Sequence, residues 1–175
     1  EDVEPELYVT GSAPALPATL RQRPLMVIHF DSEDADRRLS LLAVEAFVRA
    51  TQRKGWAIVE LGLRPIAAGL SDEVHFLGSA VSLGEQILLL KSADYFAGVD
   101  SAFLHVANAY RVPATLFLGR FRHFDHFQTF SGKFLLSPPC VLLRPPLRPA
   151  EFPAELAATA VPDCQFTNRP EQTHA

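Results

Sequence analysis

Asp100, Ser101 and His105 are the residues of this chain whose types and spacing point most directly to chemistry. The apolar run before them, residues 95–99, has the pattern of a buried strand, and residues 101–111 have the pattern of a helix. A helix that begins directly after a parallel strand presents free backbone N–H groups and the positive end of its dipole at the edge of the sheet. This combination predicts a binding site for a phosphate group.

The helical spacing also predicts how these side chains are grouped. Ser101, His105 and Asn108 share one face, because they lie at positions i, i+4 and i+7. Helical side chains lean toward the N-terminus, so we expect the imidazole of His105 to point back toward Asp100 and Ser101. The alternative is purely structural, since Asp and Ser are ordinary helix caps and a helical histidine often has only a packing role.

The segments around this group alternate between strand and helix. Short apolar runs predict strands at 25–30, 56–61, 95–99 and 114–118, with a brief strand or turn at 74–77. Apolar residues at helical spacing predict helices at 39–54 and 101–111, and a capping box opens a further helix at 82–93. Such alternation implies right-handed crossovers and a parallel sheet. The predicted fold is therefore an α/β domain of three layers, α/β/α and Rossmann-like.

The composition limits the classes of function. The chain has 175 residues, of which 48% are apolar and 21% charged, and it fits one globular domain. Its net charge of −4 gives no basic footprint for a nucleic-acid partner. No apolar run reaches the ~18 residues that span a bilayer, and no signal-peptide pattern opens the chain. Cys140 and Cys164 are expected as free thiols in the cytoplasm, with a disulfide as the alternative.

Prolines suggest how the chain is divided. We expect an extended lead-in or linker at 1–24, a ligand-binding domain at 25–148, and a proline-rich tail at 149–175 with at most one short helix near 155–160. The sequence begins with Glu rather than Met. We therefore expect it to be a piece of a longer protein that lacks a partner domain.

The stretch from Ser82 to Gly119, SLGEQILLLKSADYFAGVDSAFLHVANAYRVPATLFLG, resembles the C-terminal domain signature of glycosyltransferase family 9, the ADP-heptose:lipopolysaccharide heptosyltransferases and their relatives. The shared pattern is Asp-Ser-small-x-x-His-x-Ala after a strand, then a proline and a second strand that ends in glycine. The resemblance implies that the chain is the C-terminal half of a GT-B glycosyltransferase. The N-terminal domain, which binds the acceptor, would then be missing from it.

On this resemblance, the nucleotide-sugar donor is held by residues that match the family's diphosphate-binding positions. They are His29, Ser32, Arg37, Arg38, Asp100, Ser101, Ala102 and His105. Arg37 or Arg38 would replace a lysine of the family, and an arginine can grip a phosphate with two parallel hydrogen bonds. The chain also departs from the family pattern. Ala102 replaces a glycine, Asp31 puts a negative charge near the expected phosphate, and residues 63–65 replace a stretch that carries a nucleoside-binding glutamate.

The implied reaction is metal-independent transfer of a hexosyl or heptosyl group from the nucleotide sugar, without a cofactor, in cell-surface glycan or lipopolysaccharide synthesis. Helix N-termini around the diphosphate would stabilise the charge of the leaving group. The catalytic residues remain unknown and the chain alone is expected to be inactive; a peripheral contact with the inner membrane is compatible with this role.

Two alternatives stay open. One is a degenerate GT-B-like interaction module that has lost its ligand and docks through the phenylalanine-rich segment 120–130. The other is a sugar-nucleotide epimerase of related architecture. The cluster His123-Phe124-Asp125-His126 has the types of metal ligands but too few of them, so we predict no metal site.

Overall fold

The computed structural model describes residues 6–118, 140–143 and 148–164. Its centre is a six-stranded sheet in which every pair of neighbouring strands is parallel, as the alternation of elements predicts. The strand order is β3-β2-β1-β4-β5-β6. The bounds are Leu25–His29 for β1, Ala57–Glu60 for β2, Val74–Phe76 for β3, Tyr95–Gly98 for β4, Ala114–Phe117 for β5 and Cys140–Leu143 for β6.

This order sets the place where a ligand is expected. Strands β2 and β3 are added in turn on one side of β1, and β4, β5 and β6 are added in turn on its other side. The direction in which successive strands are added therefore reverses between β1 and β4. Open α/β sheets bind ligands in the crevice that such a reversal leaves at the carboxyl ends of the strands.

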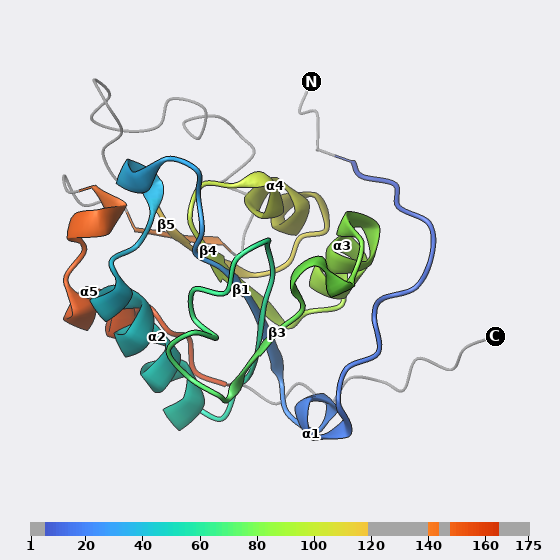
Figure 1. Ribbon diagram of the computed structural model, residues 1–175, viewed down its shortest axis with the longest axis horizontal. Helices are drawn as coiled ribbons and strands as arrows, with labels where there is room; N and C mark the ends of the chain where they lie inside the picture. The colour runs from blue at the N-terminus through green and yellow to red at the C-terminus, as the bar shows by residue number, and fades with distance from the viewer. Residues whose placement is uncertain (1–5, 119–139, 144–147, 165–175) are drawn as a thin grey trace.

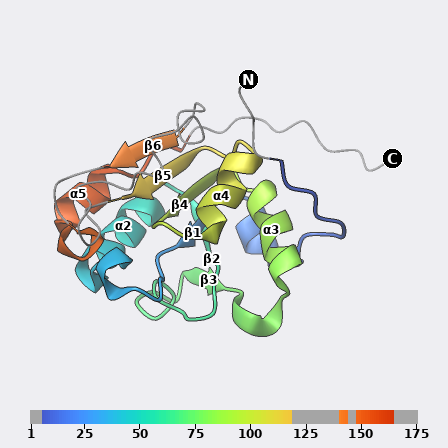
Figure 2. The same ribbon diagram turned by 90° about the horizontal axis from the view of Figure 1, so that it is seen from above.

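Helices cover both faces of the sheet and complete the predicted three layers (Figures 1 and 2). One face carries α2 (Leu41–Arg53) and α5 (Ala154–Thr159), and the other carries α3 (Leu83–Lys91) and α4 (Ala102–Ala109). A short helix, α1 (Ala18–Arg21), lies inside the predicted extended lead-in. Short 3-10 turns within the described residues are η1 (Ala35–Arg37), η2 (Gly78–Ala80) and η4 (Pro149–Glu151).

The two-sided cover explains the unbroken apolar run of β1. Leu25 and Val27 belong to the core cluster beneath α3 and α4, whereas Met26 and Ile28 belong to the cluster beneath α2 and α5. All four side chains are buried. A strand buried on both faces loses the alternation of polar and apolar residues that marks a half-exposed strand.

Local signals also set where the helices begin. At α3 the predicted capping box is present, because the Ser82 N–H donates to Glu85 Oε2 at 2.8 Å and the Glu85 N–H donates to Ser82 Oγ at 3.3 Å. At α2 the hydroxyl of Ser40 accepts from the N–H of Ala43 at 3.2 Å. Each cap satisfies donors that the first turn of a helix leaves unpaired.

The core extends past residue 148, beyond the predicted domain boundary. Phe152 and Val161 are each 2% exposed and belong to the cluster beneath α2. The end of the described chain is held by Lys54 Nζ, which donates to the Val161 carbonyl at 2.6 Å, and by Trp56 Nε1, which donates to the Pro162 carbonyl at 3.2 Å. The segment 149–164 therefore forms part of the packed fold. Strand β6 was not predicted, and the segment 120–130 lies outside the described residues.

Candidate functional site

A cavity of about 1170 Å³ opens at the carboxyl edge of the sheet. Its wall contains every predicted site residue except His105. They come from the end of β1 and from the segments that follow β1 and β4, on the two sides of the reversal in strand order. Segments after β2 and β3 add residues that the sequence did not single out, among them Leu63, Arg64, Leu83 and Gln86.

The N-terminus of α4 faces this cavity through Asp100, Ser101 and Ala102. Ser101 is the N-cap residue in an extended conformation, yet its side chain makes no capping hydrogen bond. Its Oγ atom is buried and has no hydrogen-bond partner. A buried hydroxyl without a partner is costly, and an uncapped first turn leaves backbone N–H groups open. Both features suit an acceptor-rich ligand such as a phosphate.

Asp100 orients a cation rather than capping the helix. Its Oδ2 atom lies 3.1 Å from Nη1 of Arg37, the last residue of η1. Both side chains are largely shielded from solvent, with 13% of Asp100 and 29% of Arg37 exposed. The pair links the loop after β1 to the loop after β4 and holds a guanidinium group in the cavity wall.

Asp31 is the centre of a second ionic cluster. The guanidinium group of Arg64 makes a bidentate pair with its carboxylate: Nε donates to Oδ2 at 2.7 Å and Nη2 donates to Oδ1 at 2.8 Å. Arg38 Nε lies 3.4 Å from Oδ1, and the Ser32 N–H donates to the same oxygen at 2.9 Å. The negative charge that we expected to oppose a phosphate is therefore paired with two arginines, and Arg64 is a cavity residue that the sequence analysis missed. The sequence signal for Arg64 was its position in the loop that follows β2, at the carboxyl edge of the sheet.

His29 ends β1 at the base of the cavity. Its ring packs on Phe103 with 4.9 Å between the centroids, and its Nδ1 atom is buried without a hydrogen-bond partner. Burial lowers the pKa of His29 from its ordinary 6.5 to about 4, against the opposing effect of the nearby Asp31 carboxylate. The imidazole is therefore neutral at pH 7.

Gly62 makes room for this ring. Its backbone has a φ of +116°, and a Cβ atom there would lie 3.0 Å from Cδ2 of His29. Residues other than glycine rarely adopt this backbone conformation, and a Cβ atom would lie in tight contact with the His29 ring. Glycine at position 62 therefore suits the turn after β2, and a larger residue there would press on the ring of His29.

Two buried polar side chains shape the loops after β2 and β3. Glu60 is 1% exposed and accepts hydrogen bonds from the N–H groups of Ile66, Ala67 and Ala68 at 2.8–3.0 Å. Burial raises the pKa of Glu60, and these three bonds oppose the rise. Gln86 accepts from the Gly62 N–H at 3.1 Å.

His105 lies apart from the other predicted site residues. It is exposed on α4 and does not line the cavity. Asn108, placed by spacing on the same face, is 7% exposed and buried. The side of α4 that faces the core is occupied by Phe103, Leu104 and Ala107, and this packing turns position 105 outward.

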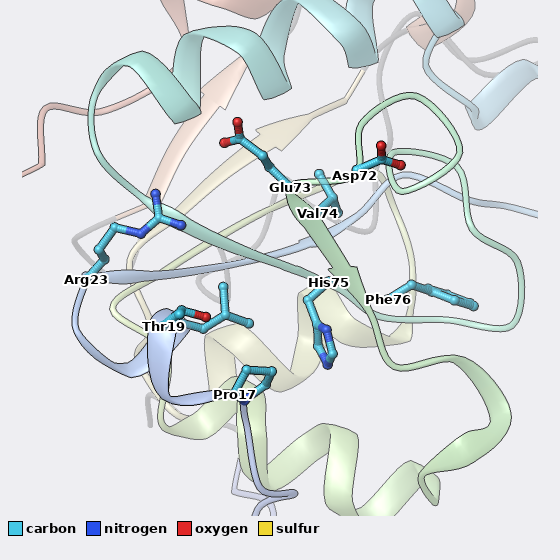
Figure 3. A pocket seen from close by; sticks show the side chains of 9 residues that line it. Pro17, Thr19, Arg23, Asp72, Glu73, Val74, His75 and Phe76 are labelled. Atoms are coloured by element: carbon cyan, nitrogen blue, oxygen red, sulfur yellow. The ribbon is translucent and has the colours of Figure 1, made fainter.

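A second cavity, of about 340 Å³, lies along the edge strand β3 (Figure 3). Arg23, Asp72, Glu73 and His75 contribute to its wall, and it contains none of the predicted site residues. Among the residues that the structure describes, no group of three or more His, Cys, Asp or Glu side chains is arranged to hold a metal ion. Over the same ranges, no helix has the length and apolar character needed to cross a membrane.

The sequence matches no protein-family model, and no curated protein matches it. Solved structures do share its fold. ADP-heptose LPS heptosyltransferase II of E. coli superposes with a TM-score of 0.63 at 16% identity, over 79% of this chain and 45% of that chain. E. coli heptosyltransferase WaaC with ADP gives 0.62 at 16% identity, over 80% and 44%. A glycosyl transferase family 9 protein from Veillonella parvula DSM 2008 gives 0.57 at 14% identity, over 74% and 36%.

Identities this low establish the fold alone. The fold is the Rossmann-like α/β arrangement that these glycosyltransferase structures contain, as the sequence predicts. The chain spans less than half the length of each of these solved chains.

Proposed function

We propose that the cavity at the carboxyl edge of the sheet binds the diphosphate of a nucleotide-activated sugar, and that this chain is the donor-binding half of a glycosyltransferase. The observation that carries the proposal is the N-terminus of α4. It opens uncapped onto the cavity, with the buried hydroxyl of Ser101 lacking a partner. Guanidinium groups of Arg37, Arg38 and Arg64 lie in the same wall.

These groups match the needs of a diphosphate. The α4 dipole and its open N–H groups favour a negative charge, and the Ser101 hydroxyl can donate to a phosphate oxygen. Arginine can hold two phosphate oxygens at once. When the bond between sugar and diphosphate breaks, negative charge grows on the leaving group, and the same groups would stabilise it. In this proposal the transfer requires no metal ion.

The rest of the reaction belongs to a domain outside this chain. Because the chain spans less than half of the solved glycosyltransferases that share its fold, we propose that an N-terminal domain supplies the acceptor site and the catalytic base. The similarity to heptosyltransferase structures favours a heptose or a related hexose, and a role in building a cell-surface glycan such as lipopolysaccharide.

Calorimetric titration with inorganic pyrophosphate and with ADP tests the donor site. We expect both to bind, and we expect Ser101→Ala to weaken both by about ten- to a hundredfold, because a hydrogen bond to a charged group contributes about 1.5–3 kcal/mol. Arg37→Gln should weaken them as well. Arg49→Gln is the matched control, since Arg49 lies on the solvent side of α2 and pairs with Glu45. If neither ligand binds at millimolar concentration, the donor site is refuted.

A specific observation favours a second candidate, an interaction module without a ligand. Arg37 is already paired with Asp100, and Arg64 with Asp31, so a diphosphate must compete with carboxylates for these guanidinium groups. In a degenerate site the ion pairs would serve only to hold the loops together. Absence of binding by pyrophosphate, ADP, UDP and GDP alike would favour this candidate.

A further inference from the structure

His29 lies beside the open end of α4. It is the last residue of β1, and its ring packs on the ring of Phe103 with 4.9 Å between the centroids. Phe103 is the second residue of α4, so the imidazole lies against the helical turn whose backbone N–H groups open onto the cavity. His29 lines the same cavity. A ligand that accepts hydrogen bonds from this turn therefore lies next to the imidazole as well.

The two nitrogens of the His29 ring have different surroundings. Nδ1 is buried, and no described residue is its hydrogen-bond partner. The opposite edge of the ring, formed by Cδ2 and Nε2, faces Gly62, where a Cβ atom would lie 3.0 Å from Cδ2 and 3.1 Å from Nε2. Gly62 is itself part of the cavity wall. Nε2 is therefore the nitrogen that lies toward the cavity.

These surroundings indicate which nitrogen carries the proton. A neutral imidazole has one N–H group, and its other nitrogen is an acceptor. Buried N–H groups without a partner are rarer in proteins than buried acceptors without one. With the proton on Nε2, the buried Nδ1 of His29 is an acceptor and the N–H group is directed to the cavity, where a ligand oxygen can accept from it.

The charged form of the ring fits this place poorly. It would carry a second N–H group, on Nδ1, buried without a partner. Burial already lowers the pKa of His29 to about 4, and the positive end of the α4 dipole acts in the same sense. The carboxylate of Asp31 favours the charged form, but it is shared with Arg38 and Arg64.

Other charged groups in the described part of the wall do not reverse this balance. They are Glu33, Arg37 and Asp100, of which the last two pair with each other. Glu60 lies beside Ile28 in the sheet register and so belongs to the opposite face of the sheet. A phosphate next to the ring would raise the pKa of the imidazole by about 1–3. A rise of this size from about 4 still leaves the imidazole mostly neutral at pH 8.

We infer that His29 binds the ligand as a neutral hydrogen-bond donor, with its one proton on Nε2 directed at a phosphate oxygen beside the first turn of α4. This inference rests on the proposed function and adds the protonation state of the site. The phosphate is bound without the uptake of a proton by His29, and the arginines and the α4 N-terminus supply the positive charge.

Calorimetric titration with inorganic pyrophosphate at pH 8 tests the inference. The amide nitrogen of glutamine can take the place of Nε2, whereas that of the shorter asparagine reaches only the place of Nδ1. We expect His29→Asn to weaken binding by about ten- to a hundredfold, as for a lost hydrogen bond to a charged group, and His29→Gln to restore it to within about threefold. His75→Asn is the matched control, because His75 lies on β3 outside this cavity.

NMR of the imidazole nitrogens in the natural chain is a second measurement that needs no variant. For His29 we expect a protonated Nε2 and an unprotonated Nδ1, both before and after saturation with pyrophosphate. A protonated Nδ1 in either state would overturn the inference, since it would mean the other tautomer or a charged ring.

The outcomes separate this inference from the proposed function. If pyrophosphate binds the natural chain but His29→Gln weakens binding as much as His29→Asn, or more, the Nε2 donor does not exist and only the inference is overturned. If pyrophosphate fails to bind the natural chain at millimolar concentration, the proposed function is refuted and the inference falls with it.

Discussion

Replacing His29 tests how the base of the cavity couples stability to pH. Burial holds the pKa of His29 at about 4 in the folded protein, whereas the unfolded chain has the ordinary value of 6.5. Between these two pH values the unfolded chain binds the proton more readily. The contribution of His29 to the free energy of unfolding is therefore complete above pH 6.5 and is lost as the pH falls toward 4.

The size of the effect follows from the two pKa values. The difference between them means that full protonation of His29 lowers the free energy of unfolding by about 3 kcal/mol in all. About 2 kcal/mol of this is already lost when the pH has fallen to 5. In His29→Asn the titrating group is absent. The free energy of unfolding of the variant should then fall less between pH 7 and pH 5 than that of the natural chain, by about 2 kcal/mol.

Urea unfolding followed by circular dichroism at pH 7, 6 and 5 measures this difference. The comparison uses the change with pH within each protein, so the packing lost at the substituted position cancels. His29→Gln serves as a second neutral replacement, and His75→Asn on the edge strand β3 accounts for the loss of a histidine elsewhere in the sheet. Parallel pH profiles for the natural chain and both His29 variants would refute the reasoning, because they would mean that His29 is protonated as easily in the folded chain.

Two further predictions concern the ionic cluster and the C-terminal segment. Asp31→Asn removes one negative charge from the cavity and keeps an acceptor for the Ser32 N–H. Pyrophosphate should therefore bind this variant more tightly in a calorimetric titration at low salt. Weaker binding would instead mean that Asp31 acts by holding Arg64 in place. Phe152→Ala should lower the free energy of unfolding by about 3–5 kcal/mol in a urea titration, because the ring is 2% exposed against Phe117. A loss under about 1 kcal/mol would show that the segment 149–164 does not unfold with the core.

Much of the fold could be predicted because its elements carry local signals. The apolar run of β1 predicts a strand, and the capping box at Ser82 and Glu85 predicts the start of a helix, each from a few neighbouring residues. Strand β6 carries no such signal: it is a four-residue apolar run, and only pairing with β5 makes it a strand. The burial of Phe152 likewise depends on α2, which lies a hundred residues earlier in the chain.

For the site, the sequence by itself determined that Asp100 and Ser101 stand between a strand and a helix, and that they would lie at the carboxyl edge of a parallel sheet. Strand and helix periodicity is a local property, and a parallel sheet brings the ends of its strands to one edge. Only the tertiary structure decided that Arg64 grips Asp31 and that His105 lies outside the cavity. The first depends on a contact between side chains 33 positions apart in the chain, and the second on which face of α4 packs against the sheet. Residue spacing along the chain does not contain that information.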